Sequence, residues 1–349
     1  MKIISAASAF PENYYSQEVM LAALRGYWNG RLENPQMLDR LHARTGVEGR
    51  HLALPMGDYY GLETWGDSNR AWFAAAEELG SKALCRSLVS AGIDRSRIGA
   101  LLFMSITGVS SPSVDARLIN RMGLSPQVRR LPIFGLGCVG GAVGISRAAD
   151  YVRAYPGQVA ALVSVETCSL TLQRDDLSVA NLISSGLFGD GAAAVLVAGD
   201  ECPAPGPTIV ATRSTFYPGT EDVMGWAISE KGFRIVLSPE VPNVIREHLG
   251  HDVDALLSEH ELDRADIGTW ILHTGGPKIL EATQEALGLP DQALAASWEC
   301  LRKVGNLSSA SVLVVLEDFM TRRRPAPGTW SILAAMGPGF CSELILLRW

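Results

Sequence analysis

The sequence predicts an α/β protein built as two similar halves, in which helices cover buried sheets. Short β-rich runs alternate with longer helical patterns along the 349-residue chain, and this alternation is typical of such architectures. Similar segments also recur in the same order in both halves. A cluster of Pro and Gly at residues 202–207 lies between them, so we divide the chain into residues 1–203 and 204–349.

Each expected element follows from its local pattern. Strands are expected where short β-rich runs occur, at residues 3–6, 100–105, 160–165, 192–197, 269–272, 331–335 and 342–348. Helices are expected where apolar residues recur with helical spacing, at residues 70–90, 139–154, 277–287, 291–303 and 308–320.

Three pairs of similar segments indicate an internal duplication. Residues 94–99 precede an apolar run just as residues 263–268 do, at an offset of 169 residues from Asp94 to Asp263. The same offset aligns two turns of small residues, 135–141 and 304–310, and each turn leads into a helical pattern. The third pair, at another offset, consists of residues 189–191 and 337–339, each before an apolar strand.

Composition excludes several classes of protein. The formal net charge is -7, and the longest run of like charge is three arginines at 322–324, so no stripe suited to nucleic acid is present. The N-terminal apolar stretch is broken by Pro11, and no run approaches the roughly 18 apolar residues of a membrane span. We therefore expect a cytoplasmic protein whose apolar surplus lies in the core or in a subunit interface.

Cysteine and histidine usage narrows the chemistry. Six cysteines are scattered without a CxxC pair, which argues against a zinc site and a disulfide framework. Cys138 opens a helical pattern, where backbone N–H groups favour a thiolate, although a small buried Cys under a turn is the alternative. His273 follows the apolar strand 269–272, the end at which open α/β folds bind ligands, although a structural histidine is equally compatible.

Asn306 lies on the turn that the duplication superposes on the Cys138 turn. A helix N-cap is the simpler interpretation, because Asn serves well at that position. A thiolate, an imidazole and a neutral amide on corresponding loops of two halves can, however, converge between them.

Four motifs support this convergence: Gly137-Cys138, residues 273–277 (His-Thr-Gly-Gly-Pro), residues 305–310 (Gly-Asn-Leu-Ser-Ser-Ala) and residues 337–340 (Gly-Pro-Gly-Phe). Together they resemble the signature of the type III polyketide synthases, the chalcone synthase-like branch of the thiolase superfamily. The resemblance runs in order from about residue 35 to the C-terminus. It implies a duplicated thiolase-like α/β/α/β/α five-layered sandwich and a homodimer.

The resemblance also implies a catalytic triad of Cys138, His273 and Asn306. Cys138, as a thiolate held by an imidazolium, would take an acyl group from a starter acyl-CoA. Malonyl-CoA would then lose carbon dioxide, and its enolate would attack the bound acyl group while His273 and Asn306 donate hydrogen bonds to the enolate oxygen. No metal and no cofactor are expected beyond the coenzyme A thioesters that serve as substrates.

Further positions carry over from the family by the same resemblance. Phe188, in residues 187–193, resembles the gatekeeper between the coenzyme A tunnel and the cavity, and Ile235 corresponds to a second gatekeeper that is aromatic in plant members. Positions expected to line the cavity are Thr107, Cys168, Thr171 and Ser308, and positions expected to contact coenzyme A phosphates are Arg40 and Arg44. Polar residues satisfied by the backbone, and a solvated helix face, are the alternatives.

Three positions bear on the starter. Ser111 stands where plant members have a Met, Ile235 where they have an aromatic, and Cys168 where some long-chain members open a tunnel. We therefore expect a medium- or long-chain fatty acyl starter and an alkylpyrone or alkylresorcinol product. The alternatives are a malonyl-CoA-only naphthalene- or phloroglucinol-type synthase, a ketoacyl synthase III-like enzyme that condenses once with an acyl carrier protein, and a noncatalytic partner subunit of the same fold.

Overall fold

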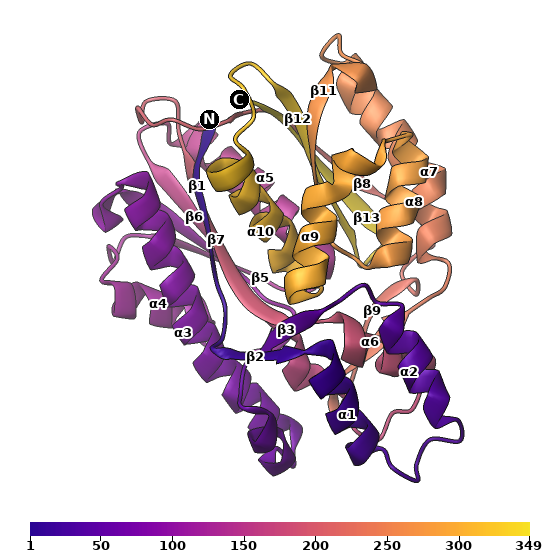
Figure 1. The fold of residues 1–349 in the computed structure, drawn as a ribbon. Coiled ribbons are helices and arrows are strands. Elements are labelled where there is room, and N and C mark those ends of the chain that lie inside the picture. Colours follow the sequence, from indigo (N-terminus) through magenta and orange to yellow (C-terminus); the bar gives the residue numbers. More distant parts are fainter.

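A nine-stranded mixed sheet runs through the computed structural model, which describes residues 1–349 (Figure 1). Its strand order is β11-β12-β13-β8-β1-β7-β6-β4-β5. The first half of the chain supplies β1 (Lys2–Ala9), β4 (Ile98–Met104), β5 (Arg129–Ile133), β6 (Val159–Thr167) and β7 (Asp190–Ala198). The second half supplies β8 (Thr208–Phe216), β11 (Ile267–Leu272), β12 (Trp330–Gly337) and β13 (Cys341–Arg348). A single residue pair, Lys2 with Thr208, joins the two sets, so they behave as two sheets meeting at an edge.

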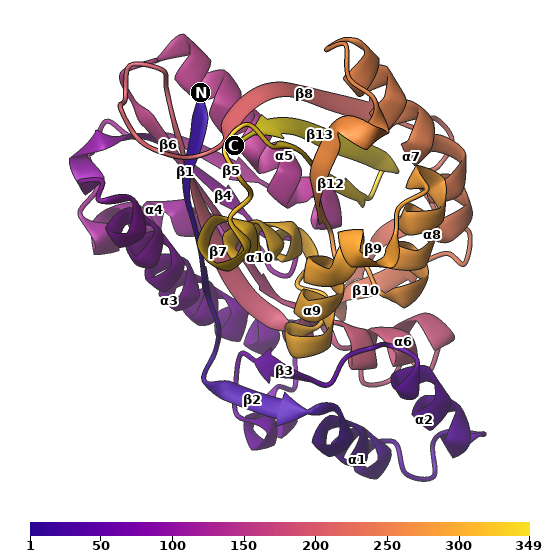
Figure 2. The ribbon, with the colours of Figure 1, turned by 45° about the horizontal axis from the view of Figure 1, so that its top comes forward.

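Helices complete a five-layered sandwich, and the predicted fold class is confirmed. α5 (Gly140–Ala154) and α10 (Ser311–Asp318) lie between the two sheets, and α3 (Trp65–Ala91) with α4 (Val114–Met122) cover the first sheet from outside (Figure 2). α7 (Val241–Ser258) and α8 (Pro277–Leu287) cover the second sheet in the same way. Three large clusters of buried apolar side chains fill the sandwich: one surrounds the central helices between the two sheets, and one lies between each sheet and its outer helices, as burial of both faces of each sheet requires.

The duplication is visible in the strand order. Outward from the junction, β7-β6-β4 in the first half corresponds to β13-β12-β11 in the second. Asp94 and Asp263 cap equivalent short turns, since their carboxylates accept from Ser96 N at 2.8 Å and from Ala265 N at 2.7 Å. Equivalent strands, β4 and β11, follow these turns.

The expected elements are present with adjusted ends. The helix expected at 291–303 begins as a short 3₁₀ turn before α9 (Ala295–Val304), and the one at 308–320 has a 3₁₀ start and a π-helical end around α10. Residue 203 lies in the connection between β7 and β8. Elements that the patterns did not reveal include β2 (Asn13–Ser16), β3 (Gly49–Leu52), β9 (Met224–Ser229), β10 (Gly232–Leu237), α1 (Gln17–Tyr27), α2 (Pro35–Ala43) and α6 (Val179–Leu187).

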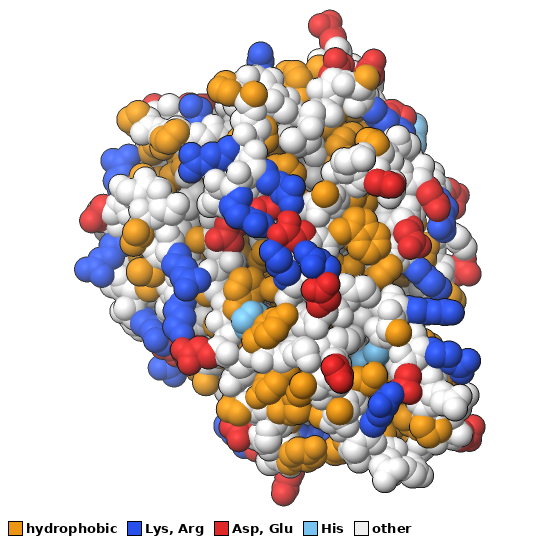
Figure 3. Space-filling view, viewed as in Figure 1, with side chains coloured by type: hydrophobic (Ala, Val, Ile, Leu, Met, Phe, Trp, Pro, Cys, Tyr) orange, Lys and Arg blue, Asp and Glu red, His pale blue; other side chains and the backbone are white.

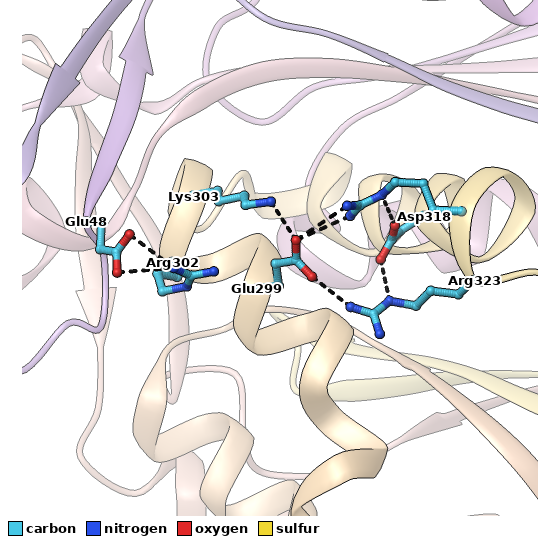
Figure 4. Close-up of polar contacts among 7 residues, drawn as sticks. Glu48, Glu299, Arg302, Lys303, Asp318 and Arg323 are labelled. Carbon is cyan, nitrogen blue, oxygen red and sulfur yellow. Dashed lines mark hydrogen bonds and ion pairs between the residues drawn. The ribbon is translucent and has the colours of Figure 1, made fainter.

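Ion pairs hold two of the three arginines that follow α10, Arg322 and Arg323 (Figure 4). Arg323 contacts Asp318 at 2.6 Å and Glu299 at 2.7 Å, while Lys303 reaches the same Glu299 at 2.5 Å. Basic and acidic side chains are interspersed across this face of the molecule (Figure 3). No helix is long and apolar enough to span a bilayer.

Candidate active site

Cys138 lies in a short 3₁₀ turn (Gly137–Val139) that leads directly into α5. Gly137 has φ +48°, and a Cβ at this position would come within 2.9 Å of the Pro338 ring, so only glycine fits the turn without strain. The turn thus packs closely on the 337–339 loop of the other half. Cys138 itself is 7% exposed.

Asn306 lies on the corresponding turn of the second half. Its side-chain oxygen accepts from Ser308 N at 2.8 Å and from Ser311 Oγ at 3.3 Å, which fixes the amide within its own turn. The Asn306 side chain also lowers the pKa of the Cys138 thiol, and its amide nitrogen is the group able to donate toward the sulfur. Asn306 therefore does more than cap the helix that follows.

Ser308 shares this site with an unusual backbone. Its φ of +48° is in the left-handed region, which is rare for a residue with a side chain and costs on the order of 1–3 kcal/mol. In this conformation its Oγ lies 3.9 Å from the Cys138 sulfur. The strained conformation thus directs a hydroxyl toward the candidate nucleophile.

His273 follows β11 and is held there because its backbone N–H donates to Ala334 O at 3.1 Å. It is 8% exposed, and neither ring nitrogen has a hydrogen-bond partner. An unpaired, buried imidazole is costly unless a ligand satisfies it. His273, Cys138 and Asn306 all line one cavity of about 580 Å³.

The pKa shifts of this pair run against the expected ion pair. Burial raises the pKa of the Cys138 thiol to about 12, against the lowering effect of Ser308 and Asn306, and the Glu166 charge raises it further. Burial alone lowers the pKa of His273 to about 4. Both shifts favour a neutral thiol and a neutral imidazole, because both groups are buried and no hydrogen bond pairs the two.

The other predicted positions divide between this cavity and a second one. Phe188, Cys168, Ile235, Ser308 and Arg44 line the large cavity. Thr171 lines only the smaller neighbouring cavity, of about 130 Å³.

Thr107 and Arg40 line neither cavity, and for Thr107 the cavity-lining prediction is wrong. Its hydroxyl donates to Glu166 at 3.0 Å and is 3% exposed, so it belongs to the buried support beneath the site. Arg40 is exposed on α2, one helical turn before the lining residue Arg44.

Sequence reasoning missed Trp226 and Glu166. Trp226 pairs with Ile235 across the β9–β10 hairpin, and with Phe188 and Cys168 these two residues border both cavities. The available signal for Trp226 was Ile235, because the residue opposite a gate position on the neighbouring strand is expected to lie beside the gate. Glu166 is fully buried at the end of β6, and burial raises its pKa to about 7 although Ile106 N and two hydroxyls donate to it.

No group of three His, Cys, Asp or Glu side chains is arranged to hold a metal ion. That the reaction needs neither metal nor cofactor stays a prediction.

Comparison with known proteins identifies the family. Models of the chalcone and stilbene synthases match the N-terminal domain over residues 64–201 and the C-terminal domain over residues 208–349. The chain belongs to this family, the type III polyketide synthases. Such synthases are acyltransferases that catalyse decarboxylating condensations, so the ketoacyl synthase III-like and noncatalytic alternatives no longer apply.

Several relatives of this synthase are bacterial. The chain is 49% identical over 350 residues to a 1,3,6,8-tetrahydroxynaphthalene synthase of Streptomyces peucetius subsp. caesius, covering 99% of this chain and 93% of that one. It is 34% identical over 339 residues to the Streptomyces coelicolor enzyme of the same name, covering 97% and 90%. A crystal structure of 1,3,6,8-tetrahydroxynaphthalene synthase from Streptomyces coelicolor superposes with a TM-score of 0.95 at 32% identity, covering 100% of this chain and 99% of that one.

Proposed function

We propose that this type III polyketide synthase uses malonyl-CoA as both starter and extender and releases a small polyhydroxylated aromatic product of the tetrahydroxynaphthalene class. The observation that carries the proposal is the likeness, over nearly the whole chain, to synthases named for that product. It favours the malonyl-only alternative over the fatty acyl starter expected from Ser111, Ile235 and Cys168.

The bulk between the two cavities supports the same choice. Trp226, Phe188 and Ile235 lie between the large cavity and the space of about 130 Å³, since they line both, as Cys168 does. A long acyl chain would gain roughly 0.8 kcal/mol per buried methylene only after passing this indole and phenyl ring. The large cavity of about 580 Å³ instead offers room for a folded chain of small units beside Cys138.

Loading begins with neutral groups. As the Cys138 sulfur attacks the thioester carbonyl, the neutral His273 ring accepts the thiol proton, the new carbon–sulfur bond forms and coenzyme A leaves as a thiolate that takes the proton. Because burial raises the pKa of Cys138 and lowers that of His273, a standing thiolate is disfavoured, and the proton moves only as the sulfur attacks. Arg44, at the lining of the cavity and without an ion-pair partner, is suited to a coenzyme A phosphate.

Extension uses the same cavity. When a second malonyl-CoA loses its carboxylate as carbon dioxide, the electron pair moves onto the thioester oxygen as an enolate. The N–H of neutral His273 and the Asn306 amide donate to that oxygen. The enolate carbon then attacks the Cys138 thioester, so a carbon–carbon bond forms while the carbon–sulfur bond breaks and the sulfur is released for the next round.

A panel of starters tests the proposal. Purified protein is given malonyl-CoA either alone or with acetyl-, hexanoyl-, decanoyl- or palmitoyl-CoA, and the products are identified by mass spectrometry. We expect malonyl-CoA alone to give the main aromatic product, with little change when other starters compete. Alkylated products that dominate whenever a fatty acyl-CoA is present would overturn the malonyl-only proposal. Light scattering of the same sample tests the homodimer, which stays a prediction.

A further inference from the structure

Arg50 is a buried cation outside the cavity that holds the triad. It lies on β3, is 1% exposed, and no carboxylate forms an ion pair with it. Burial lowers its pKa to about 10, with the nearby charge of Asp190 acting in the opposite direction. Burial of a charged guanidinium is costly unless its N–H groups donate hydrogen bonds.

The donors of Arg50 are used at the end of α6. One terminal nitrogen donates to Gly186 O at 2.7 Å and to the Gln17 side-chain oxygen at 2.5 Å, and the other donates to Ser185 O. The Gln17 amide also donates to Gly186 O, at 2.9 Å. Carbonyls at the end of a helix lack partners within it, so Arg50 and Gln17 supply the bonds that fix this end in place.

The next residues connect this end to the active site. Leu187 O accepts from Asn306 N at 2.9 Å, and Gly189 N donates to Asn306 O at 3.0 Å. Phe188 therefore pairs with Asn306 as one parallel bridge, with its ring at the border of both cavities.

Glycines allow the two segments to approach this closely. A Cβ on Gly305 would lie 2.6 Å from Leu187 O, and one on Gly189 would lie 2.2 Å from Val304 O and 3.2 Å from the Arg50 Cβ. Arg50 thus contacts the α6 end from behind, while Asn306 contacts it from the cavity side. Figures 1 and 2 show β3 and α6 together beneath the sandwich.

We propose that Arg50 is a positioning residue for malonyl decarboxylation: by holding the end of α6, it fixes the Phe188 gate and the Asn306 amide as one unit. This inference rests on the proposed role of Asn306 at the enolate step. Cys138 lies on a different turn, supported by the 337–339 loop, and Asn306 lowers its pKa less than Ser308 does, so the reactivity of Cys138 should depend on Arg50 far less than decarboxylation does.

The test separates the two steps in the full-length protein. Arg50→Met removes the donors and keeps the length of the side chain, whereas Arg50→Lys keeps a cation that can reach one carbonyl. Arg264→Met is the matched control, because Arg264 also donates to Ala286 O near the end of a helix, α8, far from the gate. The measurements are carbon dioxide release from malonyl-CoA, its kcat and KM, and alkylation of Cys138 by iodoacetamide.

We expect Arg50→Met to lower kcat for decarboxylation by roughly 10²-fold, since a displacement of about 1 Å can cost that much. Its KM and the alkylation rate should stay within about twofold of the unmodified protein. Arg50→Lys should retain part of the decarboxylation rate that Arg50→Met loses. Arg264→Met should decarboxylate malonyl-CoA at the unmodified rate. Equal losses of decarboxylation and alkylation, or no loss of either, would overturn the inference. If Arg50→Met fails to fold, Arg50→Lys decides: decarboxylation equal to the unmodified rate contradicts the positioning role.

Asn306→Ala, measured in parallel, separates this inference from the proposed function. If Asn306→Ala decarboxylates normally, the assigned role of Asn306 is wrong regardless of Arg50. If Asn306→Ala is impaired and Arg50→Met is not, only the positioning role fails.

Discussion

The two halves of the sandwich build the same turn and give it different chemistry. In the first half, Gly137 takes the left-handed conformation and the next residue, Cys138, supplies a sulfur. In the second half, Ser308 takes a left-handed conformation, and Asn306 two residues earlier supplies an amide. Both turns precede a helix of the central layer, α5 or α10.

This difference shows that the duplicated backbone provides the position and the side chains provide the function. The first half contributes the group that forms and breaks a covalent bond, and the second half contributes neutral donors. His273 strengthens the contrast, because the equivalent position after β4 carries Ser105, whose hydroxyl accepts from the Trp72 indole instead of facing the large cavity. Loading should therefore depend on the first half, and decarboxylation on the second.

Replacing Cys138 tests the first-half assignment with the largest expected effect. Cys138→Ser should lower polyketide formation by on the order of 10⁶-fold, as loss of a catalytic nucleophile does elsewhere. Peptide mapping of the unmodified protein after acyl-CoA treatment should place the acyl group on Cys138 alone. Cys168→Ala is the control, and an acyl group found on Cys168 would reverse the assignment.

Replacing Asn306 tests the second half. Asn306→Ala should slow malonyl decarboxylation by about 100- to 1000-fold, or roughly 2.7 to 4 kcal/mol, because one donor to the enolate is lost. Acyl loading of Cys138, followed by intact-protein mass spectrometry, should fall far less. A parallel fall in loading would mean that Asn306 only supports its turn and that the halves do not divide the work.

The gate between the cavities can be changed without touching either turn. Trp226→Ala should admit longer starters, each added methylene raising kcat/KM by up to about fourfold, the equivalent of roughly 0.8 kcal/mol. Adding Cys168→Phe should cancel this gain by filling the smaller cavity. A starter profile that Trp226→Ala leaves unchanged would show that the passage does not set chain length.

The buried Glu166 links the halves, since Ser309 of the second half donates to it beneath the Cys138 turn. Its charge raises the pKa of Cys138, whereas the Ser308 hydroxyl lowers it. Glu166→Gln should therefore move the pH profile of iodoacetamide alkylation to lower pH, and Ser308→Ala should move it to higher pH. Shifts in the same direction would contradict this electrostatic account.

Glu166 should also make the stability of the fold depend on pH. Burial raises its pKa from 4.5 in the unfolded chain to about 7, so the folded protein holds this proton more tightly. The contribution is fully present below pH 4.5 and is lost as the pH rises through about 7. The Glu166→Gln variant should lack this pH-dependent contribution. The difference in melting temperature between the variant and the unmodified protein should therefore change between pH 5 and 8. A constant difference would show that Glu166 stays ionised.

The sequence predicted most strands and helices of the layers, because apolar periodicity records burial directly, although it missed β8 and α7. The strand 269–272 and the helix 277–287 match β11 and α8 closely. The short exposed hairpins had no such pattern, which is why Trp226 was not recognised.

The active site was predictable from the sequence only in part. The duplication and the motifs led to Cys138, His273 and Asn306, which line one cavity. The pKa shifts of Cys138 and His273 and the contacts of Arg50 depend on burial and on the approach of distant segments, which no local pattern records.

Incubation of the unmodified protein with malonyl-CoA as the only substrate tests the central claim most directly. Release of carbon dioxide is followed together with the mass of the product, and the Cys138→Ser and Asn306→Ala variants are run beside it. The account predicts carbon dioxide and an aromatic polyketide from the unmodified protein, neither product from Cys138→Ser beyond a trace of carbon dioxide, and a loaded but unextended Cys138 in Asn306→Ala. A polyketide that forms only after a fatty acyl-CoA is added, or unimpaired extension by Asn306→Ala, would contradict it.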